Sequence, residues 1–358
     1  MPHRPIIAGH FLARRLLSRS LLAPLAAGLA LVAVAGPVAA QVNAPASARP
    51  AQPAKPATAN SPAKPATKPA AKPAASKASP VSPDPAFSAY QRGKFKTAFD
   101  LAVQRANRDG DPASMVLVGE LLSQGYGVRQ DGVAARKWFE AAAAKGNADA
   151  LFTLAAMDLG RGALNKDNAV DRLRQAAEKG NAAAAYNLGL IYLEGQVAPK
   201  EPAIAAGWFQ RAADLDQPDA LYALATLYRD GHGVPKDPVE MARLLQRADI
   251  VGNRVATTEY AIAVFNGFGV PKDEERAAEL FRKAALAGNA IAQNRYARIL
   301  SAGRGVPQDL VAAATWHLAA KAQKLDDPAL DKMMEQLTPQ QRTQAQQRLA
   351  VWSGTATP

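Results

Sequence analysis

The sequence predicts an all-α protein built as a solenoid of helix-turn-helix repeats. Similar segments return at a nearly constant interval, each carries apolar residues at helical spacing, and a glycine-rich turn follows most of them. The composition agrees, because 48% of the residues are hydrophobic but only 6% are aromatic. Alanine is the largest contributor to the apolar count, which suits closely packed helices better than sheets.

Residues 1–40 have the three parts of a secretory signal peptide. The segment opens with four arginines and no acidic residue, and residues 21–36 form a short apolar stretch. Val38 and Ala40 then stand at the −3 and −1 positions of a cleavage site, so we expect the mature chain to begin at Gln41. This predicts a periplasmic or secreted protein with no transmembrane segment after cleavage; an uncleaved membrane anchor is the alternative.

Residues 41–84 are expected to be a disordered linker rich in alanine, proline and lysine. Lys-Pro pairs recur at 55–56, 64–65, 68–69 and 72–73. Such a segment buries too little apolar surface to offset the entropy lost on ordering, and its prolines favour an extended spacer. A plain tether is the main interpretation, and a weak contact of its lysines with anionic envelope components is the alternative.

The net charge of +12 does not describe the folded part of the chain. Ten of the 43 lysines and arginines lie in residues 1–83, which contain no acidic residue, so residues 84–358 carry 33 basic and 31 acidic side chains. A nearly neutral folded region does not support nucleic-acid binding. The chain also has no cysteine, which excludes disulfides, thiolate metal sites and cysteine nucleophiles.

From residue 85 the sequence repeats itself. Similar segments run into Gly110-Asp111, Gly146-Asn147, Gly180-Asn181, Asp216-Gln217, Gly252-Asn253 and Gly288-Asn289, at intervals of 36, 34, 36, 36 and 36 residues. A fixed period of this length is typical of stacked helix pairs. The first helix of each pair carries apolar residues three and four apart, as at Ala184, Leu188, Ile191 and Tyr192.

A turn with two glycines ends the first helix in four units. These turns read Gly125-Tyr-Gly127-Val, Gly231-His-Gly233-Val, Gly267-Phe-Gly269-Val and Gly303-Arg-Gly305-Val. Glycine suits the left-handed conformation at a helix C-terminus. An aspartate follows each turn at a fixed distance and is expected to cap the second helix; these residues are Asp131, Asp237, Asp273 and Asp309.

Two units depart from this turn pattern. The second unit reads Gly160-Arg-Gly162-Ala and its turn is two residues shorter. The third reads Gly195-Gln-Val197-Ala and lacks the second glycine. We therefore expect the superhelix to be irregular at these units.

The second helix of each unit carries a pair of large apolar residues and then a pair of alanines. The large pairs are Trp138-Phe139, Trp208-Phe209, Leu244-Leu245 and Leu280-Phe281. The combined pattern is Ala-x3-Leu-Gly-x-x-Tyr-x-x-Gly-x-Gly-Val, an Asp, and then Trp-Phe-x-x-Ala-Ala-x-x-Gly. It resembles the Sel-one-like repeat family, a relative of the tetratricopeptide repeats, and residues 184–195 and 231–252 carry it best.

The resemblance divides the folded region into an array and two caps. It covers residues 111–324 as six units and implies a right-handed α-α superhelix. Residues 85–110 resemble a shorter, tetratricopeptide-like capping unit. Residues 325–358 are expected to supply C-terminal capping helices and a tail, with Thr338 and Gln341 placed to form a capping box.

The sequence predicts no catalytic residue, no cofactor and no metal. Gly-x-Gly-Val lacks the third glycine of a dinucleotide fingerprint and follows a helix, not a strand. His232 lies in a turn and His317 on a second helix, and neither has a companion at metal-ligand spacing. The sequence also contains no nucleophile elbow, and no carboxylate pair stands out beyond the repeated capping aspartates.

The variable positions of the first helices are the candidate functional residues, because relatives of this fold line their concave surface with these helices. The candidate partner-binding residues are Tyr186, Asn187, Tyr222, Thr226, Glu259, Arg295 and Arg298. An ordinary solvated face, or core packing for the tyrosines, is the alternative. Arg295 and Arg298 lie three residues apart, so they can share a helix face and bind an acidic segment.

These observations lead to the hypothesis of a non-enzymatic, extracytoplasmic adaptor or scaffold that binds other proteins. Such a protein would act in envelope assembly, secretion or periplasmic regulation. The alternative is an envelope enzyme, or enzyme subunit, that acts on cell-wall glycan or peptide. Clustered carboxylates on the concave face would favour the enzyme, and a neutral groove with apolar patches would favour the adaptor.

Overall fold

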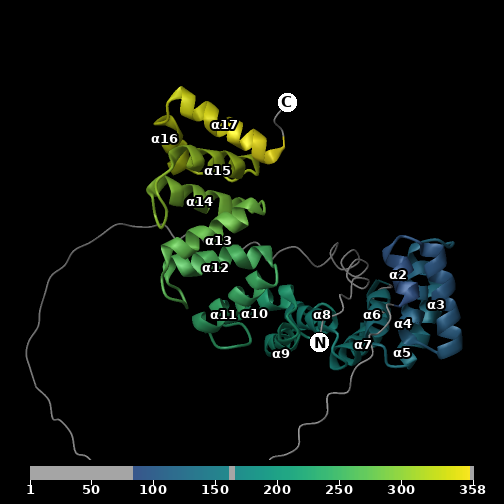
Figure 1. Ribbon diagram of the computed structural model, residues 1–358. Helices are drawn as coiled ribbons and strands as arrows, with labels where there is room; N and C mark the ends of the chain where they lie inside the picture. The colour runs from purple at the N-terminus through teal and green to yellow at the C-terminus, as the bar shows by residue number, and fades with distance from the viewer. Residues whose placement is uncertain (1–83, 161–165, 355–358) are drawn as a thin grey trace, which may run out of the picture.

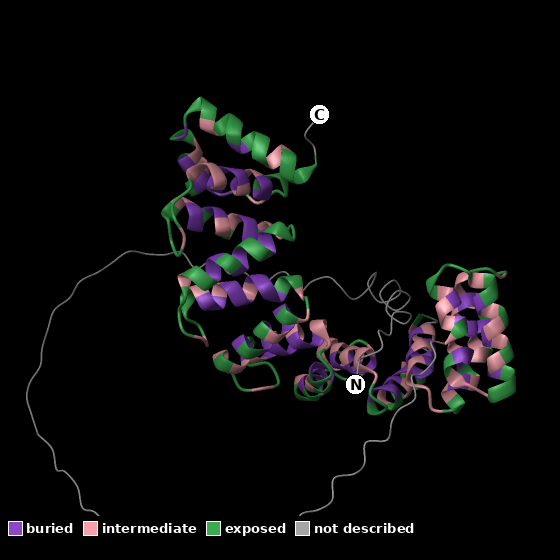
Figure 2. Cartoon of the chain, viewed as in Figure 1, coloured by how far each residue is buried: buried purple, intermediate pink, exposed green. Residues whose placement is uncertain are grey.

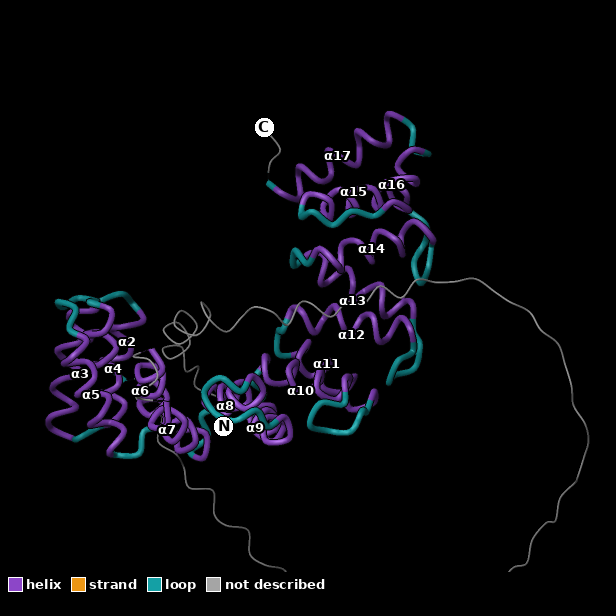
Figure 3. The backbone as a smooth tube through the Cα atoms, turned by 180° about the vertical axis from the view of Figure 1, so that it is seen from behind, coloured by secondary structure: helices purple, strands orange, loops and turns teal. Residues whose placement is uncertain are grey.

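The computed structural model describes residues 84–160 and 166–354. These residues form helices joined by loops, and no strand occurs among them (Figures 1 and 3), so the all-α prediction is confirmed. The predicted signal peptide, all but the last residue of the predicted linker, and most of the shortened turn of the second unit lie outside the described residues.

The helices pair in the order of the chain. The capping pair is α2 (Pro85–Gln91) and α3 (Phe95–Asp109). The first helices of the six later pairs are α4 (Pro112–Gln124), α6 (Ala148–Gly160), α8 (Ala182–Glu194), α10 (Pro218–Asp230), α12 (Arg254–Asn266) and α14 (Ala290–Ala302). Their second helices are α5 (Gly132–Ala144), α7 (Lys166–Glu178), α9 (Pro202–Asp214), α11 (Pro238–Ile250), α13 (Glu274–Leu286) and α15 (Leu310–Ala322). Two further helices, α16 (Pro328–Glu335) and α17 (Pro339–Ser353), follow.

The pairs stack into a curved array with its two ends well apart (Figure 1). Each helix packs mainly on its neighbours in the chain, and α17 covers α15 at the C-terminal end. In the bend of the array, α8 and α10 lie toward the inside and α9 and α11 toward the outside. Buried residues run between the helices along the whole array (Figure 2), so each unit completes its core only against its neighbours.

The core depends on small residues of the first helices that face large residues of the second helices. A Cβ atom added at Gly119 would lie 2.8 Å from the ring of Phe139. The same addition at Gly189 would overlap the ring of Phe209. Both phenylalanines are buried, so the glycines allow the two helices of a unit to approach closely enough to enclose an aromatic ring.

The second glycine of each turn packs against the start of the second helix in the preceding unit. A Cβ atom at Gly233 would overlap the backbone of Pro202, and one at Gly269 would overlap the carbonyl of Pro238. Gly305 faces Glu274 in the same way. All three glycines also have a positive φ, so both the backbone conformation and the lack of space require glycine at these positions.

The two units that depart from the turn pattern meet at one junction. Val197 stands where the other units have the second glycine, and its turn faces the start of α7, where the Lys166 Nζ donates a hydrogen bond of 2.9 Å to the carbonyl oxygen of Gln196. Helix α7 in turn follows the shortened loop of the second unit. The altered loop and the missing glycine therefore belong to the same contact between units.

A buried ionic cluster accompanies this irregular unit. Asp158 of α6, 3% exposed at its side chain, occupies the position that holds Tyr192 and Tyr228 in the next two units. It accepts hydrogen bonds from Arg136 of α5, at 2.9 Å, and from Arg172 of α7. The cluster therefore joins α5, α6 and α7. Removing one of its members would leave a buried charge uncompensated.

The predicted helix caps are confirmed. Asp131, Asp237, Asp273 and Asp309 each accept a hydrogen bond from a backbone N–H in the first turn of the second helix that follows. Thr338 and Gln341 form the complete capping box that starts α17. These caps satisfy backbone groups that a helix start leaves without partners, which fixes the ends of the helices locally.

The turn packing yields a stability prediction. We expect Gly269→Ala to lower the free energy of unfolding by at least about 2 kcal/mol, because the new methyl group meets Pro238 and the positive φ disfavours alanine. Gly207→Ala is the control. It lies within α9 with open space around it, so it should raise the stability by about 0.5–1 kcal/mol. Thermal and urea unfolding followed by circular dichroism measure both changes; equal stability of the two variants would contradict this account of the turn.

Candidate protein-binding face

The seven candidate residues lie on α8, α10, α12 and α14, the first helices of four consecutive units. We call the surface that these first helices present the inner face, because α8 and α10 lie on the inside of the bend (Figure 1). The helix spacing places Tyr186, Tyr222 and Asn294 at one repeat position, and Thr226 and Arg298 at another. Equivalent residues of successive first helices therefore form rows that run from unit to unit.

Tyr222, Glu259 and Arg229 form a network that joins two units. The hydroxyl of Tyr222 donates a 2.7 Å hydrogen bond to Glu259 Oε1, and Arg229 Nη1 lies 3.0 Å from Glu259 Oε2. Arg229 also pairs with Asp230, at 3.0 Å. Burial and the hydrogen bond to Glu259 raise the pKa of Tyr222 well above its ordinary value, so the hydroxyl remains a donor. The network fixes α10 against α12 and orders this part of the inner face.

Arg298 binds the C-terminal cap. Its Nε lies 2.6 Å from Oδ2 of Asp327, the buried residue that caps α16. Asn294 donates a 2.7 Å hydrogen bond to the same oxygen. Burial of Asp327 opposes ionisation, but Arg298 and Asn294 outweigh it and lower the pKa of the carboxyl group. Arg298 does bind an acidic residue, but one that belongs to its own chain.

Three of the candidates are partly buried and engaged within their own unit. The Tyr186 ring packs on Phe209, with ring centroids 5.7 Å apart. Asn187 Nδ2 donates to the carbonyl oxygen of Ala183 at 2.7 Å, and Thr226 Oγ1 donates to that of Ala223 at the same distance. The alternative of core packing therefore describes a large part of what Tyr186 does.

Arg295 is the candidate with an uncommitted charge. It is exposed on α14, and it has no hydrogen-bond or ion-pair partner among residues 84–160 and 166–354. The structure therefore separates the two arginines that the sequence grouped together. Arg298 holds the cap, and Arg295 is available to a partner.

Glu120 holds the equivalent position on an earlier first helix, although it was not among the candidates from the sequence. On α4 it occupies the repeat position of Thr226 and Arg298, so the repeat register was the signal that could have found it. It is partly buried beside Tyr90, whose hydroxyl lies 3.5 Å from Glu120 Oε1. Burial raises the pKa of its carboxyl group to about 7.

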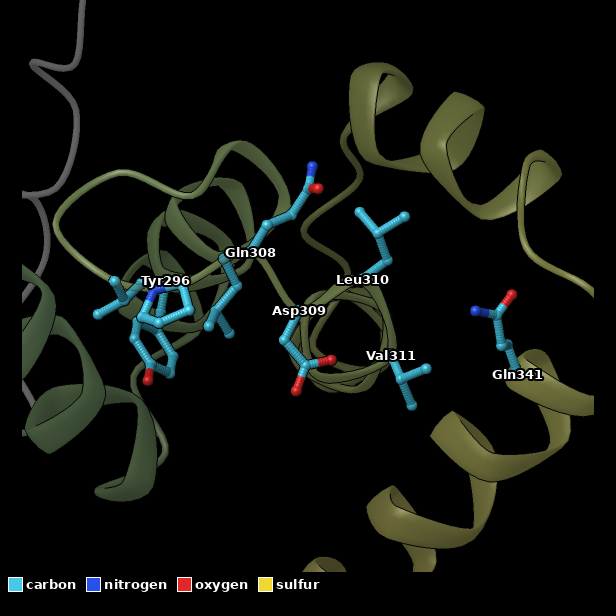
Figure 4. A pocket seen from close by; sticks show the side chains of 9 residues that line it. Tyr296, Gln308, Asp309, Leu310, Val311 and Gln341 are labelled. Atoms are coloured by element: carbon cyan, nitrogen blue, oxygen red, sulfur yellow. The ribbon is translucent and has the colours of Figure 1, made fainter.

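A shallow hollow lies at the C-terminal end of the array, between α14, the turn that follows it, α15 and the start of α17 (Figure 4). Its lining residues are Tyr296, Leu300, Val306, Pro307, Gln308, Asp309, Leu310, Val311 and Gln341. Asp309 caps α15 and Gln341 belongs to the capping box of α17, so the lining carboxylate and one of its amides already serve as helix caps.

The histidine that the sequence places on a second helix is also engaged in the fold. His317 is fully buried at the repeat position of Phe209 and Phe281, and its Nε2 lies 2.9 Å from Asp331 of α16. Within the described ranges, no cluster of three His, Cys, Asp or Glu side chains could hold a metal ion. In the same part of the chain, no helix is both long enough and apolar enough to cross a membrane.

Comparisons with known proteins agree with the repeat geometry. The model of the Sel1 repeat matches residues 112–147, 182–217, 218–248, 256–289 and 290–325. The irregular pair α6 and α7 lies between the first two matched segments. A search of curated proteins gave no significant match.

Two solved structures share the fold. The protective antigen c5321 of uropathogenic Escherichia coli strains, which displays an SLR fold, gives a TM-score of 0.60 at 24% identity, over 75% of this chain and 61% of that chain. A Sel1 repeat protein from Oxalobacter formigenes gives a TM-score of 0.56 at 28% identity, over 70% of this chain and 74% of that chain. The chain thus spans less than two thirds of the antigen's length.

The raised pKa of Glu120 gives a pH-dependent prediction. The folded protein holds this proton more tightly than the unfolded chain, so the stabilisation is present at low pH and is lost as the pH rises through about 7. We expect Glu120 to make the free energy of unfolding about 2 kcal/mol lower near pH 8.5 than near pH 5.5. Urea unfolding of the wild type and of Glu120→Gln at both pH values isolates this contribution. If both proteins depend on pH equally, the assignment to Glu120 is wrong.

Proposed function

Because this chain belongs to the Sel1 repeat family, we propose that it is a non-enzymatic adaptor or scaffold that binds other proteins on its inner face. The adaptor would act in envelope assembly, secretion or periplasmic regulation. Proteins with this repeat typically mediate protein interactions, and the helix pairs supply a long, continuous surface for that purpose.

The contrast between constant turns and a variable inner face carries the proposal. The turns keep two glycines in four units, because the packing between units requires them. The inner-face position of Glu120 instead holds Leu190, Thr226, Ile262 and Arg298 in later units. A surface that differs from unit to unit on a constant scaffold is suited to one particular partner.

The chemistry of the inner face is that of a protein interface. Leu190 and Ile262 are half-buried and apolar, and they alternate with polar and charged positions. Arg295 offers a guanidinium group without a partner in the described residues, and arginine is among the residues that contribute most to interface energy. The bonds among Tyr222, Glu259 and Arg229 order the surface before a partner arrives, which reduces the entropy cost of binding.

We place this activity outside the cytoplasm. The arginine-rich leader, the apolar stretch and the site between Ala40 and Gln41 support export. The proline-rich residues that follow would then separate the array from the leader, and they would let it reach partners at some distance.

Export is tested by the N-terminus of the exported protein. We expect mass spectrometry of the chain recovered from the envelope or the medium to find Gln41 as its first residue, because the leader has the features of a cleaved signal. Ala40→Leu, which puts a large side chain at the −1 position, should slow this cleavage. Recovery of the unprocessed chain from the cytoplasm would contradict the proposal.

Photocrosslinking tests the binding surface. A benzophenone side chain placed at Arg295 of the inner face should crosslink to a partner in cells. The same group at Glu279, which is exposed on the second helix α13, is the matched control and should give no product. Products at position 279 alone would place the interface on the other side of the array.

A partner identified in this way permits an affinity measurement. Arg295→Ala should weaken binding at least about tenfold while the melting temperature stays unchanged, because Arg295 has no partner among the described residues. His232→Ala, in an exposed turn, should bind normally. If His232→Ala weakened binding and Arg295→Ala did not, the partner would bind at the turns and not at the inner face.

A further inference from the structure

Exposed aliphatic residues gather on the edge where second helices end and the next first helices begin. They are Leu215, Ile250, Val255, Leu286 and Ile291, which we call the apolar edge. Ile250, at the end of α11, is 75% exposed. Isolated exposed aliphatic residues are ordinary, but these five occupy three consecutive turns of one array, and such a concentration marks an interaction surface.

The apolar edge is confined to the C-terminal half of the array. Ile250 and Leu286 end their helices at the position that holds Ala144 and Glu178 in the earlier units. Val255 and Ile291 take the position of Asp149 and Ala183. The repeat itself therefore does not require large aliphatic residues here.

Charge changes sign along this edge. The turn between α9 and α10 carries Asp214, Asp216 and Asp219 around Leu215. Asp216 pairs with Arg247 and Asp219 accepts a hydrogen bond from Asn253, so Asp214 is the main charge that this turn presents to another molecule. The turn between α13 and α14 instead has Arg282 and Lys283 beside Leu286. Lys283 pairs with Asp249 of α11 at 2.6 Å, so Arg282 is the cation that this turn presents to another molecule. Arg282 and Leu286 are four residues apart on α13, so they lie on the same helix face. The acidic end and the basic end are thus separated by the central turn, which carries Ile250 and Val255.

Two residues of the acidic end have unfavourable local positions in the fold. Asp214 is the last residue of α9, where the helix dipole disfavours a carboxylate. Asp216 has a φ of 54° at the position where Gly180, Gly252 and Gly288 stand in other units. Arg247 Nη2 pairs with Asp216 at 2.7 Å and also donates to the carbonyl oxygen of Ala213, so Asp216 is stabilised within the chain. Among the described residues, Asp214 accepts a hydrogen bond only from Gln210, and a cation of another molecule would offset the cost of its charge.

We propose that the apolar edge joins two copies of this chain in a two-fold symmetric dimer. An axis near the central turn sets Ile250 and Val255 against the same residues of the second copy. It also sets the acidic turn of each copy against the basic turn of the other, so that charge and apolar surface are complementary at once. An anionic lipid surface would suit the basic end only, because the three aspartates at the other end would be repelled.

Sedimentation equilibrium of the full chain tests the dimer. We expect a concentration-dependent dimer for the wild type, and at least about 30-fold weaker association for Ile250→Glu, which sets two carboxylates together at the axis. Val239→Glu is the matched control. Val239 is 64% exposed at the opposite end of the same helix, so this variant should dimerise normally.

Charge reversal tests the orientation. Asp214→Arg and Arg282→Asp should each weaken association at least about tenfold, and the double variant should restore it. Asp214→Arg favours the end of α9, so its effect cannot come from unfolding. A wild type that stays monomeric, or a double variant as weak as the singles, would overturn the proposal. Flotation of a monomeric chain with phosphatidylcholine–phosphatidylglycerol vesicles, lost in Ile250→Glu, would likewise overturn it and assign the edge to lipid.

Discussion

The structure depends on a contact between units that leaves no room for a side chain. Gly233, Gly269 and Gly305 bring the turn of one unit onto the start of the second helix of the unit before it. This contact sets the distance between neighbouring units, so the same residue type is required wherever the unit repeats. Where Val197 replaces the glycine, the facing start of α7 differs as well, and the buried cluster around Asp158 binds the adjacent helices instead.

This arrangement of the junctions leaves the first-helix surface free to vary. The core needs only a small residue facing a large one, as Gly189 faces Phe209, and the turn needs only its glycines and the capping aspartate. Charged or apolar side chains can therefore occupy the inner face without disturbing the stacking. The alternation of Leu190 and Ile262 with Thr226 and Arg298 is one such choice, and it supports the proposed binding of a protein partner.

The inner face and the apolar edge would serve different contacts. The inner face is partly ordered by its own bonds, such as that between Tyr222 and Glu259, and it presents Arg295. The apolar edge lies at the ends of the helices and has opposite charges at its two ends. A scaffold that pairs through its edge keeps both inner faces accessible, so dimerisation would double the number of binding surfaces without competing with a partner.

The sequence by itself determined the period, the helix ends and the caps, because these depend on residues only a few positions apart. The positive φ of Gly269, the cap formed by Asp237 and the capping box of Thr338 and Gln341 are of this kind. Only the tertiary structure decided which of the seven candidate residues are available, since the partners of Tyr222 and Arg298 lie about one unit away. Glu259 is 37 residues from Tyr222, and Asp327 is 29 residues from Arg298. The stacking of neighbouring helices brings such pairs together, and no local pattern in the sequence records it.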